Sequence, residues 1–196
     1  VMSAHPRGTQ LILSGPNTVS IWDPDDNRLV ARFEGFKEAV DALSLGDDII
    51  VSEYDTGRVL RFHPASPDAR TVIASGLEVP AGLAVHRGNL YVADRSGTLF
   101  QILDDGERLD PPRSVVSGLA GPEGIAADED GALYVVEEDA DRVIRVDPET
   151  GVATLVVTDL ALHGVEQKSI EKATSVGFLA GIAVGGGSLY VSGYPE

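Results

Sequence analysis

Histidine and the carboxylates are the side chains that could do chemistry in this chain, because cysteine is absent. Without cysteine there is no disulfide, no thiolate nucleophile and no Cys-ligated metal. No two of the four histidines stand at the spacing of zinc ligands, which argues against a histidine-based zinc site. The sequence also lacks a G-x-S-x-G elbow, a P-loop and a Rossmann glycine pattern, so serine-hydrolase and nucleotide chemistry have no support.

Carboxylates are numerous, and one of them stands inside a repeated phrase. Residues 80–94 read PAGLAVHRGNLYVAD, and residues 121–138 read GPEGIAADEDGALYVVEE, with Glu123 where the earlier phrase has alanine. Asp41 holds the corresponding place in the preceding unit, allowing one residue of slack, and Ala180 holds it in the last unit. Hard cations bind about six or more oxygens, so these two acids alone do not complete a cation site.

Charge and composition exclude several classes of partner. Hydrophobic residues make up 43% of the 196, and 15 basic residues stand against 31 acidic ones, for a net charge of −16. This balance argues against nucleic acid or an anionic membrane as a partner, because phosphate binding needs a basic surface. No apolar run approaches the roughly 20 residues of a transmembrane helix. The chain shows no signal peptide, but its start is predicted to lie inside a structural unit, so the compartment stays open.

The elements that must position these residues are repeated strands. Five similar segments recur at spacings of 38, 41, 43 and 56 residues, and they are LILSG (11–15), IIVSE (49–53), LYVAD (90–94), LYVVE (133–137) and LYVSG (189–193). A period near 40 with strand-type content is typical of propeller blades. Each full period holds four strand candidates separated by turns, and no amphipathic helix of adequate length lies between them. The sequence therefore predicts an all-β propeller of four-stranded antiparallel blades rather than a parallel sheet.

The predicted units make one β-propeller domain over residues 1–196 with about four and a half blades. Their approximate bounds are 1–36, 37–77, 78–119, 120–159 and a partial unit at 176–196. The first strand of the first unit is placed at VMSA. A six-bladed ring of this period needs about 250 residues, so we expect a fragment that lacks about one and a half blades. Self-association through the open blade edges is the alternative.

The repeated phrases resemble those of a known group of propellers. P-A-G-L-A-V…L-Y-V-A-D and P-E-G-I-A-A-D…L-Y-V-V-E…R-V-I-R-V are similar to NHL repeats, and more loosely to the gluconolactonase and strictosidine-synthase-like six-bladed propellers. The first unit, NTVSIWDPDDNRLVARFEG, is similar to YVTN repeats. The resemblance covers nearly the whole chain and specifies fold better than activity. In the gluconolactonase-like family, P-N-G and P-D-G residues bind a divalent cation over the channel, which implies Asp41 and Glu123 as ligands for Ca²⁺ or another divalent cation.

Antiparallel alternation sorts the loops onto two faces. The loops from fourth to first strands and from second to third strands share the face of the channel mouth. His5 and His86 are expected in equivalent first-to-second turns on the opposite face, together with His63, which follows a third strand. The acids that end the second strands are expected to cap turns, and they are Glu53, Asp94 and Glu137.

An insertion at residues 160–178 accounts for the longest spacing and joins a fourth strand to a first strand, over the channel-mouth face. Long loops on scaffolded faces often carry function. A lid with His163, Glu166 and Lys168 would fit a small-molecule pocket, and His163 is the candidate general base. A partner-binding loop and an inert insertion fit the same sequence.

Two classes of function follow. The first is a non-catalytic, NHL-type propeller module that binds a small molecule or a protein on the channel-mouth face. The second is a divalent-metal-dependent lactonase, hydrolase or lyase, in which Asp41 and Glu123 hold a cation that polarises a carbonyl and His163 acts as base. We favour the binding module, because it needs no catalytic constellation and tolerates the alanines between the two acids.

Overall fold

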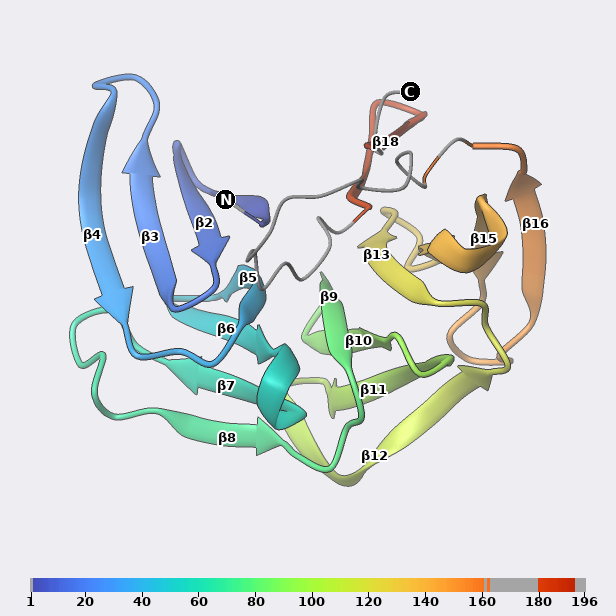
Figure 1. Ribbon diagram of the computed structural model, residues 1–196, viewed down its shortest axis with the longest axis horizontal. Coiled ribbons are helices and arrows are strands. Elements are labelled where there is room, and N and C mark those ends of the chain that lie inside the picture. Colours follow the sequence, from blue (N-terminus) through green and yellow to red (C-terminus); the bar gives the residue numbers. More distant parts are fainter. Residues whose placement is uncertain (1, 161, 163–179, 193–196) are drawn as a thin grey trace, which may run out of the picture.

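The computed structural model describes residues 2–160, 162 and 180–192. Four four-stranded antiparallel sheets and one two-stranded sheet follow one another along this part of the chain (Figure 1). Within each sheet the neighbouring strands are consecutive in sequence. The sheets are the blades of a partial β-propeller, which confirms the predicted fold class.

Each four-stranded blade is an antiparallel meander. Blade 1 consists of β1 (Ala4–Arg7), β2 (Gln10–Gly15), β3 (Thr18–Asp23) and β4 (Arg28–Glu34). Blade 2 consists of β5 (Ala39–Leu45), β6 (Asp48–Glu53), β7 (Arg58–Phe62) and β8 (Thr71–Ala74). Blade 3 consists of β9 (Pro80–His86), β10 (Asn89–Asp94), β11 (Thr98–Asp104) and β12 (Glu107–Ser117).

The remaining elements complete the described part of the chain. Blade 4 consists of β13 (Pro122–Ala127), β14 (Leu133–Glu137), β15 (Arg142–Val146) and β16 (Ala153–Val157). Blade 5 has the strands β17 (Ile182–Gly185) and β18 (Ser188–Val191). Two short 3₁₀ helices follow second strands, and they are η1 (Tyr54–Thr56) and η2 (Glu138–Ala140). Among the described residues, no helix has the length and hydropathy needed to cross a membrane.

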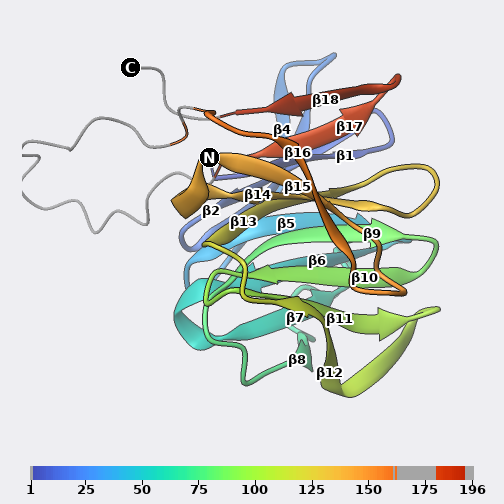
Figure 2. The same ribbon diagram turned by 90° about the vertical axis from the view of Figure 1, so that its right-hand side faces the viewer.

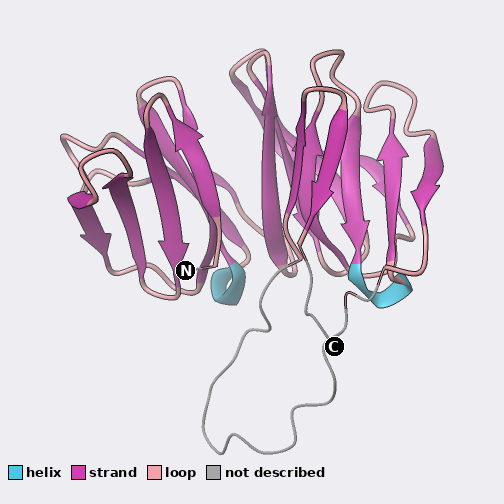
Figure 3. Cartoon of the chain, turned by 90° about the horizontal axis from the view of Figure 1, so that it is seen from above, coloured by secondary structure: helices cyan, strands magenta, loops and turns pink. Residues whose placement is uncertain are grey.

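The first strands lie toward the centre of the ring. Figure 1 shows β5, β9 and β13 near the centre and β4, β8, β12 and β16 at the rim. Figures 2 and 3 show the connecting loops gathered at the two opposite ends of the blades, with η1 and η2 at the same end. This is the two-face arrangement that the antiparallel alternation predicts, and it brings the starts of the first strands together at one mouth.

Apolar side chains are buried on both faces of the inner blades, because each of these blades packs between two neighbours. Between blades 1 and 2, the rings of Phe33 and Phe62 meet edge to face with centroids 5.1 Å apart. Between blades 3 and 4, Tyr91 packs in one cluster with Ile125 and Leu133. These contacts explain why the strands carry apolar residues at both alternating positions.

The acids that end the second strands cap the neighbouring loops, as expected. Glu53 Oε1 accepts a hydrogen bond of 2.9 Å from the Lys37 N–H. Asp94 accepts from the backbone N–H groups of the loop before β9, at 2.8 and 3.0 Å. Glu137 Oε1 accepts from the Ala120 N–H at 2.7 Å. These hydrogen bonds to loop N–H groups account for the burial of the three carboxylates, and no binding role is needed to explain it.

The first strand of blade 1 begins later than VMSA suggested. Strand β1 spans Ala4–Arg7 and the turn to β2 lies at residues 8–9, so the placement at residues 1–4 was wrong. This shift moves His5 out of the turn and into the strand. The assignment of His5 to the face away from the channel mouth was therefore also wrong.

The register of the inner strands shows that Asp41 and Glu123 are offset by one residue, as the sequence alignment allowed. Counting from the residue paired with the acid at the end of the second strand, Asp41 is third in its unit and Glu123 is second. Asp41 therefore corresponds to Gly124 rather than to Glu123. The predicted base His163, with Glu166 and Lys168, lies outside the described residues.

Candidate functional site

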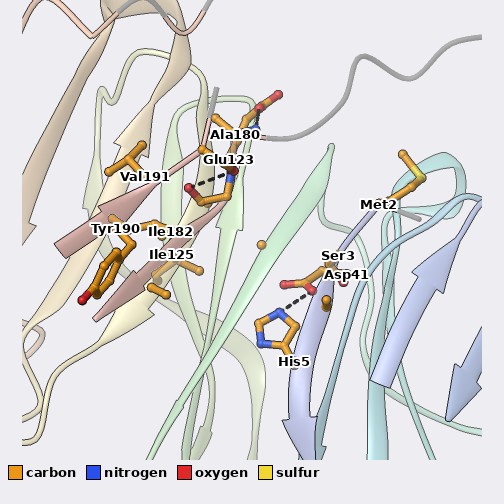
Figure 4. Close-up of a pocket in the computed structure, with 16 residues that line it drawn as sticks. Met2, Ser3, His5, Asp41, Glu123, Ile125, Ala180, Ile182, Tyr190 and Val191 are labelled. Carbon is orange, nitrogen blue, oxygen red and sulfur yellow. Dashed lines mark hydrogen bonds and ion pairs between the residues drawn. The ribbon is translucent and has the colours of Figure 1, made fainter. Parts of the chain in front are cut away.

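The first strands converge on a cavity of about 370 Å³ at the centre of the ring (Figure 4). The residues that line it come from blades 1 to 5 and include both predicted metal ligands, Asp41 and Glu123. Ile125, Ile182 and Val191 lie across the cavity from His5 (Figure 4). The site thus has one polar wall and one mainly apolar wall.

Asp41 is fully engaged by protein donors. Its Oδ1 atom accepts hydrogen bonds of 2.8 Å from His5 Nε2 and from the Ala42 N–H, and Oδ2 accepts one of 2.8 Å from the Leu83 N–H. The residue is 5% exposed. Burial acts to raise the pKa of Asp41, but the charge of His5 and the donated hydrogen bonds outweigh it, so the pKa lies below its usual value.

His5 of β1 joins blade 1 to the adjacent blade 2 through its contact with Asp41 of β5 (Figure 4). A carboxylate can only accept, so the Asp41 contact places a proton on Nε2 of His5. The other ring nitrogen, Nδ1, faces the cavity, and no described residue donates to it or accepts from it (Figure 4). The charge of Asp41 raises the pKa of His5, and burial opposes that rise only in part.

Glu123 is held in a similar way on the opposite side. Its Oε2 atom accepts a hydrogen bond of 2.9 Å from the Ala180 N–H, and Oε1 lies 3.0 Å from Arg95 Nη1. Arg95 also contacts Glu138 and Asp139 at the mouth. The Glu123 side chain is 1% exposed, and this burial raises its pKa to about 7. The nearby Glu138 adds to the rise, while the Ala180 hydrogen bond and the charge of Arg95 oppose it.

These donor sets do not fit a divalent cation. The oxygens of Asp41 and Glu123 already receive backbone N–H groups and the side chains of His5 and Arg95. Across residues 2–160, 162 and 180–192, no group of three or more His, Cys, Asp or Glu side chains is placed to hold a metal ion. Calcium needs about six or more oxygen ligands. Donor groups of the chain itself therefore occupy the carboxylate oxygens that a bound cation would need.

The other described histidines lie away from the cavity, as expected. His86 ends β9, and its ring would lie 3.0 Å from a side-chain carbon added at Gly131. His63 follows β7, and its Nδ1 atom accepts a 3.1 Å hydrogen bond from the Ala65 N–H. His5 is the one described histidine that lines the cavity, and the sequence pattern had placed it on the opposite face. Side chains two residues apart in a strand point to the same side. His5 could therefore have been placed with Ser3, on the side of β1 that faces Asp41, if the start of the strand had been predicted correctly.

Comparisons with known proteins define the class of protein. No family model matches the chain, and no curated protein matches it. Among solved structures, a streptogramin B lyase matches with a TM-score of 0.61 at 14% identity, over 80% of this chain and 54% of that one. A selenomethionine-substituted virginiamycin B lyase from Staphylococcus aureus also matches with a TM-score of 0.61 at 14% identity, over 78% and 54%.

A chain of a mitotic checkpoint complex matches with a TM-score of 0.63 at 16% identity, over 76% of this chain and 47% of that one. All three matches are to β-propeller structures, so the fold is that of a β-propeller. The chain spans about half the length of the proteins it matches. At this identity the likeness shows the fold and does not transfer an activity.

Proposed function

We propose that this chain is a β-propeller binding module that holds a small organic ligand in its central cavity. The observation that carries the proposal is the cavity itself, about 370 Å³ in volume, at the point where the first strands of all five blades meet. Ligand pockets of small molecules begin at about 300 Å³ and combine apolar walls with few polar groups. A cavity of this form suits a small molecule better than a flat protein surface.

The chemistry of the walls describes the ligand. Ile125, Ile182 and Val191 offer apolar surface, and Nδ1 of His5 offers one directed polar contact. Asp41 and Glu123 already have side-chain partners in His5 and Arg95, so the ligand does not have to pair with either carboxylate. We infer a neutral compound with an apolar body and a single polar group.

Methyl NMR with benzamide as probe tests this function. Benzamide should shift the Cδ1 methyl signals of Ile125 and Ile182 in a saturable manner. Ala4→Phe fills the cavity from β1 and should abolish the shifts, because Ala4 is an exposed residue of its lining. Ala153→Phe, at an exposed position of rim strand β16, is the matched control and should leave the shifts intact. Equal responses in both variants, or no response in the unmodified chain, would contradict the proposal.

A metal-dependent hydrolase or lyase remains the alternative proposal from the sequence. It requires Asp41 and Glu123 to exchange their present donors for a cation. The occupied carboxylates favour the binding module instead.

A further inference from the structure

The polar wall of the cavity holds an oriented base. Asp41 fixes the proton of His5 on Nε2, through the 2.8 Å contact, and this leaves a lone pair on Nδ1 when the imidazole is neutral. The ring cannot turn over without losing that contact. A base held by a buried carboxylate behind it is the arrangement expected of general acid–base sites.

The buried partner is itself rigidly held. The backbone N–H groups of Ala42 and Leu83 donate to Asp41, which anchors the carboxylate to β5 and β9. Ser3, which precedes β1, accepts a hydrogen bond of 3.3 Å from the Ala42 N–H and so helps to hold β1 against β5. The dyad thus rests on three inner strands, and its geometry does not depend on a loop.

The opposite wall determines which reaction the base can serve. Ile125, Ile182 and Val191 are apolar, so a substrate there is partly removed from water. An ester hydrolysis would need several donors for an oxyanion, which this wall does not supply. Removal of a proton from carbon, with the charge spread over the substrate, needs only the base and the apolar surface.

We propose that His5 is a general base, positioned by Asp41, that removes a proton from a small neutral carbon acid bound in the central cavity. In this step the C–H bond breaks, the proton moves to Nδ1 of His5, and the electron pair stays on the substrate. His5 then returns the proton to solvent. The inference rests on the proposed ligand cavity and adds an activity to it.

The elevated basicity of His5 supports this role, because Asp41 raises the pKa of the imidazole. The groups that face the ring are Asp41 from β5 and, on the far side of the same cavity, Glu123 from β13. The reaction rate should therefore rise with pH as His5 loses its proton, at a pH above the 6.5 of free histidine.

The test uses 5-nitrobenzisoxazole, which needs only one proton removal from carbon. When the base takes that proton, the C–H electron pair forms the third bond of a nitrile, the ring N–O bond breaks, and a coloured phenolate is released. His5→Gln should lower the rate about 100-fold or more, because a positioned general base usually contributes about 10²–10⁴-fold. His86→Gln, at the end of β9 and outside the lining of the cavity, should leave the rate unchanged.

The Asp41→Asn variant tests whether Asp41 positions and activates His5 or only stabilises the fold. It should reduce the rate and move the midpoint of the pH–rate profile to lower pH, because the charge that raises the pKa of His5 is gone. If this variant does not fold, the profile of the unmodified chain is decisive, with a midpoint above pH 6.5 expected and one at or below it contradicting the dyad.

Failure of the inference can be told apart from failure of the proposed function. One outcome is that benzamide shifts the Ile125 and Ile182 methyl signals while His5→Gln turns over 5-nitrobenzisoxazole as fast as the unmodified chain. In that case His5 is not the base, and the proposed ligand cavity is still supported. If benzamide produces no shift and turnover equals that of buffer, both proposals are overturned.

Discussion

At the scale of single residues, two carboxylates near the channel are each held by a basic side chain of the preceding blade. Asp41 pairs with His5, and Glu123 pairs with Arg95. A buried charge is costly unless it is paired and hydrogen-bonded. The two pairs differ in their effect on the carboxyl pKa: the pKa of Asp41 is lowered, whereas that of Glu123 is raised to about 7.

Glu123 should make folding stability depend on pH. Its pKa is raised from 4.5 in the unfolded chain to about 7 in the fold, so its contribution is complete below pH 4.5 and is lost as the pH rises to 7. Between pH 5 and 8 the free energy of unfolding should fall by about 2–3 kcal/mol more in the unmodified chain than in Glu123→Gln.

Urea denaturation at both pH values measures this difference. Glu129→Gln, in an exposed turn, serves as the control and should keep the pH dependence of the unmodified chain. Identical pH dependence in the unmodified chain and Glu123→Gln would mean that the carboxyl group is not buried as described.

At the scale of elements, the inner strands approach so closely that glycine is required. A side-chain carbon at Gly124 would lie 2.2 Å from the Ala180 carbonyl oxygen, and one at Gly82 would lie 2.3 Å from the Glu123 carbonyl oxygen. Both atoms belong to backbone of the next blade, which cannot yield as a flexible side chain can. These glycines set the spacing of the strands that form the cavity.

Gly124→Ala should therefore destabilise the fold by about 2 kcal/mol or more, in the range of overpacked core positions. Gly185→Ala is a matched control, because Gly185 also lies in a first strand but an added carbon there meets no atom within 4 Å. Thermal and urea denaturation of the two variants compare the effects. An equal loss in both variants would contradict the close packing of blades 4 and 5.

Much of the fold, but only part of the site, could be predicted from the sequence. The strand period follows from a pattern that repeats in every unit, and the capping role of Asp94 follows from an acid that recurs in the second, third and fourth units. Both are seen in the structure. The His5–Asp41 pair could not be predicted, because it joins residues of two blades and depends on where β1 begins. Placing that strand at residues 1–4 instead of Ala4–Arg7 puts the side chain of His5 in a turn instead of in the channel.

At the scale of the whole molecule, the blades at the two ends of the arc present apolar surface. Leu29 of blade 1 is 48% exposed and Tyr190 of blade 5 is 64% exposed. Trp22 pairs with Leu29 on the face of blade 1 opposite to Ile21, which packs toward blade 2. The six-bladed parent ring and the self-association through open edges both stay predictions.

We propose that the channel binds an organic ligand and that its two acids are held by His5 and Arg95 instead of by a metal ion. Calorimetric titration of the chain with Ca²⁺ at pH 7.5, where Asp41 is ionised, tests this claim most directly. The structure predicts no saturable heat, because a cation would have to displace protein donors from both carboxylates. Tight one-to-one Ca²⁺ binding that is lost in Glu123→Gln would contradict the account and favour the metal-dependent enzyme.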